Sequence, residues 1–277
     1  MSVSVVIGVF NGEGLITRCV ESVMAQTLQP SEIIIVNDGS SDGSLAELRL
    51  LESRFPDMLD IRSQKNKGVA AVLNSAVARC SGEYVANADQ DDFFTADRLE
   101  KSVALLQETN ADMMGGQLVG GLGERLLLLK SRFATDPESI ADAIAHGFDP
   151  LPHATMMVRR DGFERFGGYR LNRRAEDLEI MLRWAHRGAK IVVSPDVLAY
   201  YTLRREHVSL NVQTRWMLYT QYARDVACLP DDEVPDFGRW FSTQPMGPAR
   251  REARRRVFRM SARLALGTLT RSSMPSD

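Results

Sequence analysis

Residues 3–44 read VSVVIGVFNGEGLITRCVESVMAQTLQPSEIIIVNDGSSDGS, and this stretch decides the fold. The apolar, β-branched run Val3–Val9 is followed by a turn and by a helical pattern from Leu15 to about Gln26. The next apolar run, residues 33–36, is too short and too stiff for a helix and is typical of a strand buried on both faces of a parallel sheet. A strand, a helix and a second strand in this order predict the first unit of a parallel α/β sheet.

The same alternation continues through the first 110 residues. It predicts helices over 45–55 and 69–78 and strands over 59–62 and 84–88. A further helix is predicted to begin at Thr95, as its N-cap, and to reach about Glu108. We therefore expect an α/β fold with a Rossmann-like, mostly parallel central sheet flanked by helices.

The second half of the chain is less regular. Asp136 and Pro137 are typical of an N-cap and a first helical position, for a helix that reaches His146. Gly188 is a natural end for a helix over 176–187. Short strands are predicted over 154–158, 191–193 and 197–202, and the pattern beyond Thr214 is helical with a proline-rich interruption.

The composition is that of an ordinary globular protein: 44% of the 277 residues are hydrophobic and 25% are charged, which excludes disordered and fibrous classes. Cys19, Cys80 and Cys228 are far apart, so neither a disulfide framework nor a zinc site is expected. The N-terminus lacks the features of a signal peptide, and no apolar run approaches the ~20 residues that span a bilayer. These features predict a cytoplasmic protein in a reducing compartment.

The net charge of −2 hides a basic C-terminus. From Pro248 onward, two acidic residues stand against eight arginines: Arg250, Arg251, Arg254, Arg255, Arg256, Arg259, Arg263 and Arg271. One expectation for this segment is a solvated helix packed on the protein. The alternative is a helix on an anionic membrane surface, which would place the protein peripherally at the inner face of the membrane. Nucleic-acid binding is not expected, because the basic tail comes without a recognised domain.

Polar residues gather where the predicted strands end, which is where open parallel sheets bind ligands. They lie in three loops, over residues 10–13, 37–43 and 89–92. The loop 37–43, taken alone, is explained almost as well by a turn that caps a helix. Asp89, Asp91 and Asp92 crowd three like charges behind a strand, and a divalent cation such as Mg²⁺ or Mn²⁺ would relieve their repulsion. A solvated loop is the alternative.

A set of motifs resembles family 2 of the inverting glycosyltransferases. In the family's order they cover residues 3–11, 33–44, 66–68 with Asn74, 82–85, 89–92, 166–169, 176–178 and 204–209. Each motif is weak singly, but the ordered set over residues 2–210 is specific. The resemblance implies a GT-A fold and transfer of a sugar from a nucleoside diphosphate sugar, with UDP favoured, to a hydroxyl of a carbohydrate, lipid-linked or small-molecule acceptor.

The resemblance also implies site residues. It places Phe10 beside the base, Asp38 on the base edge and Asp89 near the ribose. It makes Asp91 the ligand of a Mn²⁺ or Mg²⁺ ion, and His207 reaches the metal or the diphosphate. The wider donor site comprises Asn11, Glu13, Gly68, Asn74 and Gln90. Asp177 is the implied general base, and the acceptor-side candidates are His153, for which a structural role is the alternative, Glu176 and Trp216.

The chain departs from the family pattern at two places. Asn37 stands where many members have an acidic residue. Val72-Leu73-Asn74 stands where many have Ala-Arg-Asn, so this helix lacks the arginine that would contact the diphosphate. The resemblance divides the chain into a nucleotide-sugar-binding segment, 1–110, an acceptor-binding segment, 111–210, and a helical C-terminal extension, 211–277.

Helical geometry gives an independent check on Asp177. At ~100° per residue, Asp177 falls on the inward side of its helix beside Met181 and Trp184. The opposite, polar face gathers Glu176, Glu179, Arg183, His186 and Arg187. An inward carboxylate at a helix start is either an N-cap or a functional base, and the helix N-terminus helps to keep it ionised. Inversion requires one base on the acceptor hydroxyl and no covalent nucleophile.

Two other function classes stay open. A sugar-phosphate nucleotidyltransferase also combines a nucleotide-binding α/β sheet with a metal, but it normally has a basic residue in a glycine-rich loop after the first strand. Residues 10–14 contain no lysine or arginine. The other class is a non-catalytic nucleotide-sugar-binding protein, against which the presence of Asp91 and Asp177 counts.

Overall fold

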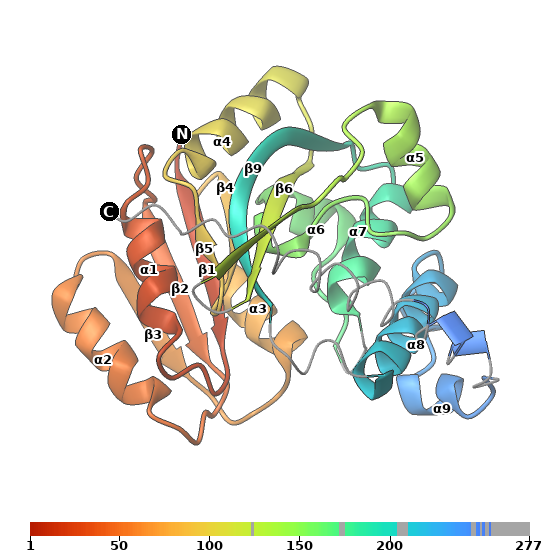
Figure 1. Ribbon diagram of the computed structural model, residues 1–277, viewed down its shortest axis with the longest axis horizontal. Coiled ribbons are helices and arrows are strands. Elements are labelled where there is room, and N and C mark those ends of the chain that lie inside the picture. Colours follow the sequence, from red (N-terminus) through yellow and green to blue (C-terminus); the bar gives the residue numbers. More distant parts are fainter. Residues whose placement is uncertain are drawn as a thin grey trace.

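The computed structural model describes residues 1–122, 125–171, 175–203, 210–244, 248–249, 251–252 and 255. One sheet runs through the molecule, and helices cover both of its faces (Figure 1). This is the expected α/β architecture, with a mixed but mostly parallel sheet.

The N-terminal part of the sheet is parallel throughout and has the strand order β3-β2-β1-β4. Its strands are β1 (Val3–Val9), β2 (Glu32–Asn37), β3 (Leu59–Ser63) and β4 (Tyr84–Asp89). Its connecting helices are α1 (Ile16–Met24), α2 (Ser44–Arg54) and α3 (Val69–Val77). The ends of these elements lie within two residues of those predicted from apolar patterning.

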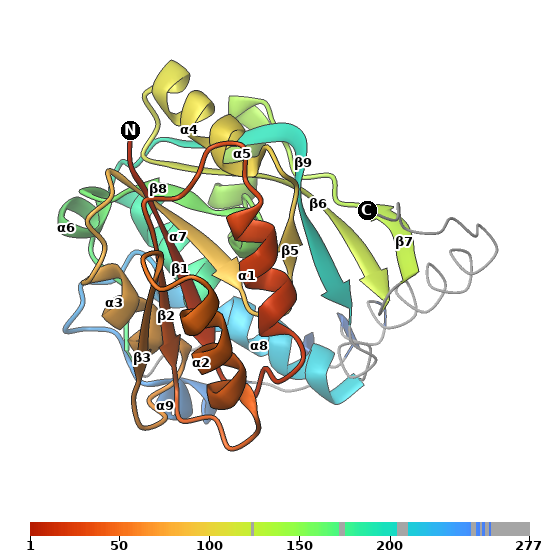
Figure 2. The same cartoon turned by 90° about the vertical axis from the view of Figure 1, so that its left-hand side faces the viewer.

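Beyond β4 the sheet becomes mixed. The added strands are β5 (Phe93–Phe94), β6 (Met113–Leu122), β7 (Arg125–Lys130), β8 (Met157–Arg159) and β9 (Ile191–Leu203). β8 pairs antiparallel with both β4 and β6, so β6 and its parallel partner β9 run in the direction of β1–β4. Figure 2 shows β6, β7 and β9 together at the end of the molecule away from β3.

The remaining helices complete the two layers and the C-terminal part. They are α4 (Arg98–Thr109), α5 (Pro137–Ala145), the 3₁₀ helix η1 (His153–Thr155), α6 (Gly162–Phe166), α7 (Glu176–His186), α8 (Leu210–Val226) and α9 (Phe237–Phe241). Figure 1 shows α8 beside α7 and α9 beside α8, at the opposite end of the molecule from α2. None of the described helices combines the length and apolarity needed to cross a membrane.

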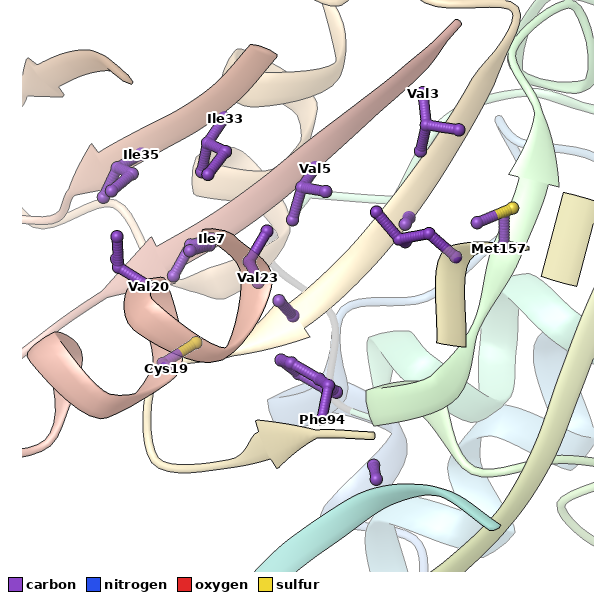
Figure 3. Packing of buried hydrophobic residues seen from close by; sticks show 14 of the residues in the cluster. Val3, Val5, Ile7, Cys19, Val20, Val23, Ile33, Ile35, Phe94 and Met157 are labelled. Atoms are coloured by element: carbon purple, nitrogen blue, oxygen red, sulfur yellow. The ribbon is translucent and has the colours of Figure 1, made fainter. Parts of the chain in front are cut away.

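Alternating side chains of β1 divide the core in two. Figure 3 shows Val5 and Ile7 next to Val20 and Val23 of α1, and Val3, of the same core cluster, further along β1 toward Met157. Val6 faces the other side of the sheet, which α3, α6 and α7 cover. A continuous apolar run in the sequence is thus required because both faces of the strand are buried.

The sequence predictions for the sheet beyond β4 were wrong in several details. The predicted N-cap Thr95 is wrong: α4 begins at Arg98 behind Asp97, and the backbone of Thr95 bonds Leu198 of β9 instead. β6 was missed because Gly115 and Gly116 interrupt its apolar pattern. A Cβ at either position would lie within 2.7 Å of a side-chain atom of Leu151 or Leu198, so close packing requires glycine there.

Three shorter predictions also changed. The strand predicted over 154–158 divides into η1 and β8, and the two strands predicted over 191–202 are one long strand, β9. The sequence pattern was interrupted there by Pro195, and the pairing register of β9 with β6 shifts near this residue. The N-cap at Asp136 is confirmed, because its Oδ1 accepts a hydrogen bond from the amide of Ser139 at 2.8 Å.

Candidate functional site

A cavity of about 460 Å³ is lined by the carboxyl end of β4, by η1 and by the first turn of α7. Its polar lining consists of Asp89, Asp149, His153, Glu176 and Asp177. Its apolar lining includes Leu73, Leu118, Phe133, Leu151 and Met181. These residues are far apart in sequence, and the pairing of β4 with β8 brings η1 against the end of β4. Candidates for both sides of a transfer site, Asp89 on one and His153, Glu176 and Asp177 on the other, therefore line one cavity.

A smaller cavity, of about 230 Å³, shares Gly8 and Val69 with the first. It is lined by Phe10, Asp38, Gly68 and Gln90 among others. Phe10 is 47% exposed, so its ring presents a flat apolar surface on which an aromatic base can stack. The two cavities together offer adjoining spaces for a base and for a sugar.

Gln90 fixes the backbone of Phe10. Its Oε1 accepts from the amide of Phe10 at 3.0 Å, and its Nε2 donates to the carbonyl of Phe10 at 3.1 Å. A Cβ at Gly12 would lie 2.3 Å from Oε1 of Gln90, so the loop after β1 requires glycine beside this amide. The loops after β1 and β4 are thereby held in one arrangement.

Asn11 and Glu13 join the loop after β1 to the loop after β2. Oδ1 of Asn11 accepts from the amide of Ser41 at 2.9 Å, and Oε2 of Glu13 accepts from the amide of Gly43 at 2.9 Å. In return, the hydroxyl of Ser40 accepts from the amide of Asn11 at 3.0 Å. These side chains shape the loops that carry the smaller cavity, and a direct contact of either with a donor stays a prediction.

Asp38 is 3% exposed and uses both carboxylate oxygens within the protein. Oδ1 accepts from Nε2 of Gln64 at 2.8 Å and from the amide of Lys67 at 2.9 Å, and Oδ2 accepts from the amide of Gly68 at 2.8 Å. Gly68 has a φ of 86° and precedes α3, a conformation that glycine adopts at little cost. Asp38 thus shapes the turn that forms one wall of the smaller cavity.

Asn74 connects α3 to the loop after α6. Its Nδ2 donates to the carbonyl of Tyr169 at 2.7 Å, and its Oδ1 accepts from the amide of Tyr169 at 2.9 Å. A Cβ at Gly168 would lie 2.7 Å from this Oδ1, which explains a glycine in that loop. Asn74 was predicted to lie in the donor site. In the structure its side chain positions the backbone of Tyr169 through these two hydrogen bonds.

The three carboxylates of the acidic loop after β4, those of Asp89, Asp91 and Asp92, differ in burial and in what they contact. Asp92 is 1% exposed, and its Oδ1 accepts from the amide of Thr202 at 3.0 Å. Burial raises the pKa of Asp92 to about 8; the charges of Asp89 and Asp91 add to the rise, whereas Thr202 and Arg98 oppose it. Asp92 therefore anchors β9 to the loop, and Asp89 is the carboxylate of this loop that lines the larger cavity.

Arg98 is a buried cation behind the acidic loop, and the sequence analysis missed it. It is 1% exposed, its Nη2 donates to the carbonyl of Asn87, and its guanidinium lies 4.0 Å from the ring centroid of Phe94. Burial lowers its pKa to about 10, which still leaves it charged at neutral pH. An arginine in the first turn of a helix next to an acidic loop is a sequence signal for this role. The positive charge of Arg98 thus offsets part of the repulsion among the carboxylates of the acidic loop, which the sequence analysis expected a divalent cation to relieve.

His153 has both ring nitrogens engaged and a side chain that is 12% exposed. Nδ1 lies 3.1 Å from Nδ2 of Asn87 and 3.8 Å from Oδ1 of Asp89, and Nε2 lies 3.0 Å from the hydroxyl of Tyr169. Burial alone would lower the pKa of His153, but the nearby charge of Asp89, with the charges of Asp177 and Glu176, raises it above its usual value. The same contact keeps the pKa of Asp89 below its usual value against the effect of burial.

Asp177 is the second residue of α7 and lines the larger cavity. The N-cap interpretation of Asp177 is wrong, because the N-cap position belongs to Ala175, which has a φ of 54° and makes no side-chain cap. Oδ1 of Asp177 accepts from the neighbouring amide of Leu178 at 2.8 Å. A carboxylate in the first turn is favoured by the partial positive charge of the helix N-terminus.

The predicted polar face of α7 is wrong for Glu179 and Arg183, whereas His186 and Arg187 are exposed as predicted. Glu179 and Arg183 are each 1% exposed and form an ion pair, with Nε of Arg183 2.8 Å from Oε1 of Glu179. Nη1 of Arg183 donates to the carbonyl of Phe166 at 2.7 Å, and Nη2 donates to that of Gly168 at 2.7 Å. A helical wheel assigned these charges to solvent because it contains no information about the carbonyls they meet after folding.

The metal assignment can be tested against the donor atoms present. Asp91 lies two residues after the end of β4. No group of three or more His, Cys, Asp or Glu suited to a metal ion occurs in the described part of the chain. Mg²⁺ is typically held by one or two carboxylates together with substrate phosphates, and not by a cage of protein ligands alone. One or two aspartates of this loop fit that mode. His207 and the side chain of Trp216 lie outside the described residues.

Residues 4–167 match the family model "Glycosyl transferase family 2". The chain belongs to this family. EpsE of Bacillus subtilis (strain 168), which carries a glycosyltransferase name, is 32% identical over 196 residues, covering 67% of this chain and 67% of its own. The amylovoran biosynthesis glycosyltransferase AmsE of Erwinia amylovora is 29% identical and covers 70% of this chain and 74% of its own. These matches favour glycosyl transfer over the nucleotidyltransferase alternative.

Solved structures show the same fold at lower identity. The mannosyltransferase PcManGT of Pyrobaculum calidifontis, in complex with GDP-Man and Mn²⁺, has a TM-score of 0.65 at 20% identity, over 98% of this chain and 76% of its own. S. aureus TarS, in complex with UDP-GlcNAc, has a TM-score of 0.62 at 21% identity, over 89% of this chain and 74% of its own. The sheet of this family 2 glycosyltransferase is therefore of the GT-A type.

The family 2 match ends at Gly167, within the loop that follows α6. It includes Asp38, Asp89, Asp91 and His153, whereas Glu176 and Asp177 come after it. The cavity joins the two sets, because Asp89 and His153 line it together with Asp177. The cavity therefore combines residues of the matched segment with residues that follow it.

Proposed function

We propose that this family 2 glycosyltransferase transfers a sugar, with inversion, from a nucleoside diphosphate sugar to an acceptor hydroxyl. The observation that supports the proposal is the larger cavity, which is lined by Asp89 at the end of the nucleotide-side sheet and by Asp177 at the start of α7. The proposal assigns residues 1–110 to donor binding, 111–210 to acceptor binding and 211–277 to a helical extension.

In the proposed reaction, Phe10 stacks on the base and the turn shaped by Asp38 forms the wall beside it. Asp177 accepts the proton of the acceptor hydroxyl, and the acceptor oxygen forms a bond to the anomeric carbon of the donor sugar. The bond from that carbon to the diphosphate oxygen breaks, and the nucleoside diphosphate leaves with the electron pair. One base is sufficient for this displacement, and the helix N-terminus favours the ionised form that Asp177 needs.

We assign a Mn²⁺ or Mg²⁺ ion to Asp91, with His207 as a second candidate ligand. Such an ion, when bound, neutralises the charge of the diphosphate and favours its departure. The support is the carboxylate chemistry of the loop after β4 and the Mn²⁺ in the PcManGT complex. The protein itself holds this loop in place by two hydrogen bonds. The side chain of Gln90 accepts from the amide of Phe10, and the side chain of Asp92 accepts from the amide of Thr202.

We favour a UDP-sugar as the donor and a glycan or glycoconjugate hydroxyl as the acceptor. UDP is the nucleoside diphosphate expected from the family resemblance, and the TarS complex contains it as UDP-GlcNAc. PcManGT carries GDP-Man, so the fold alone accommodates either base. The name of AmsE refers to amylovoran biosynthesis, which supports a polysaccharide-type acceptor.

We also keep peripheral membrane contact through the arginine-rich segment as part of the proposal. Eight arginines against two acidic residues from Pro248 onward support it.

A thermal-shift screen with UDP, GDP, UDP-GlcNAc and GDP-Man, each with and without Mn²⁺, tests the proposed donor. A ligand at 100 times its dissociation constant adds about 2.7 kcal/mol to the free energy of unfolding. We expect the largest rise in melting temperature with UDP compounds and Mn²⁺. A chain that no nucleotide stabilises would contradict donor binding, and stabilisation by GDP compounds alone would replace UDP with GDP.

A further inference from the structure

His153 stands where three parts of the molecule meet. It belongs to η1, its Nδ1 faces Asn87 and Asp89 of β4, and its Nε2 faces Tyr169 of the loop after α6. The cavity that it lines is also lined by Glu176 and Asp177 of α7. A displacement of this ring would therefore change the lining that Asp89 shares with the carboxylates of α7.

The ring of His153 has polar partners at both nitrogens and an aromatic neighbour. Tyr169, which is 4% exposed, faces the ring edge-on, with the two centroids 6.0 Å apart. The backbone of Tyr169 is itself fixed by the two hydrogen bonds of Asn74, and the neighbouring carbonyl of Gly168 accepts from Arg183. A buried ion pair on α7 thus supports the loop that orients the imidazole.

We propose that His153 is a positioning residue for sugar transfer, which holds Asp89 on the donor side in register with Asp177 on the acceptor side. This inference rests on the proposed function. Its physical basis is that transfer depends on the reacting groups being held in a near-attack geometry, and a misplacement of about 1 Å can cost about 100-fold in rate. Tyr169 acts through His153, because its hydroxyl is the partner of Nε2.

Two variants separate positioning from simple stability. Tyr169→Phe removes only the hydroxyl and keeps the ring and the backbone contacts with Asn74. His153→Gln keeps a polar group but loses the second ring nitrogen and the rigid geometry. His146→Gln is the matched control, because His146 ends the helix α5 at the surface with a side chain that is 63% exposed.

The experiment measures melting temperature, nucleotide affinity, and kcat and KM for release of nucleoside diphosphate from UDP-GlcNAc and from GDP-Man with Mn²⁺, first without an acceptor. We expect Tyr169→Phe and His153→Gln to lower kcat by about 10-fold or more, with KM and melting temperature nearly unchanged. We expect His146→Gln to match the unaltered chain.

Each outcome bears on one hypothesis. An unaltered chain that binds and turns over no nucleotide contradicts the proposed function itself. If the unaltered chain is active and both variants retain kcat within about twofold, the positioning role is overturned. A fall in melting temperature with kcat per folded molecule preserved would show that His153 is structural, and would equally overturn the proposal.

Discussion

Nε of Arg183 lies 2.8 Å from Oε1 of Glu179, and each side chain exposes only 1% of its surface. Arg170 adds a second guanidinium, with its Nη1 2.9 Å from the same Oε1. Arg183 also donates to the carbonyls of residues 166, 167 and 168 and to Oε2 of Glu179. The buried charges of α7 therefore connect the helix that carries Asp177 to the loop that carries Tyr169.

Loss of Arg183 should destabilise the fold strongly, because Glu179 loses one of its two arginine partners and the carbonyl of Gly168 loses the hydrogen bond from Nη2. We expect Arg183→Ala to lower the free energy of unfolding by about 3–5 kcal/mol, measured by urea denaturation. Arg187→Ala is the control: Arg187 also donates to Phe166 but is 37% exposed, so its loss should cost about 1 kcal/mol or less. Equal losses for both would contradict a special role of the buried pair.

Asp177→Asn should abolish most transfer and leave the fold intact. Asparagine keeps an Oδ1 that accepts from the amide of Leu178 but removes the proton acceptor. Loss of a general base typically costs about 10²–10⁴-fold in rate, so kcat should fall by that factor with nucleotide affinity and melting temperature unchanged. Glu176→Gln, one residue away in the same cavity, should be much milder. Near-normal turnover in Asp177→Asn would place the base elsewhere.

Donor binding should depend on a divalent metal and on Asp91. Calorimetric titration with UDP is expected to give much weaker binding in EDTA than in Mn²⁺, because the carboxylates of this loop repel a diphosphate. Asp91→Ala should abolish the difference. Asp92→Asn is the matched control, since asparagine can still accept from Thr202 and Asp92 is buried. Equal affinity in EDTA and Mn²⁺ would remove the metal from the mechanism.

The arginine-rich segment should bind anionic membranes and be dispensable for the nucleotide. We expect the full chain to sediment with phosphatidylglycerol vesicles at low salt and to be released as salt shortens the range of the attraction. A chain that ends before Pro248 should stay in solution and keep the UDP affinity of the full chain. Equal sedimentation of the two chains would leave the segment as a structural tail.

The sequence by itself determined the parallel half of the sheet. Runs such as 33–36 are apolar on both faces, and the only place for such a strand is between two layers of helices, so local patterning and tertiary structure agree. The strand-end positions of Asp38 and Asp89 followed from the same pattern, because ligand sites of open sheets lie at the carboxyl ends of strands.

Tertiary structure alone decided which charged residues face solvent and which are buried. Arg183 pairs with Glu179 and donates to the carbonyl of Phe166, 17 residues upstream of Arg183, and no helical period can record that second partner. Asp92 and Arg98 face inward for the same reason, and His153 meets Asp89 only because β8 pairs with β4. A buried charge is tolerated where specific partners offset its desolvation, and those partners come together only when distant segments fold against each other.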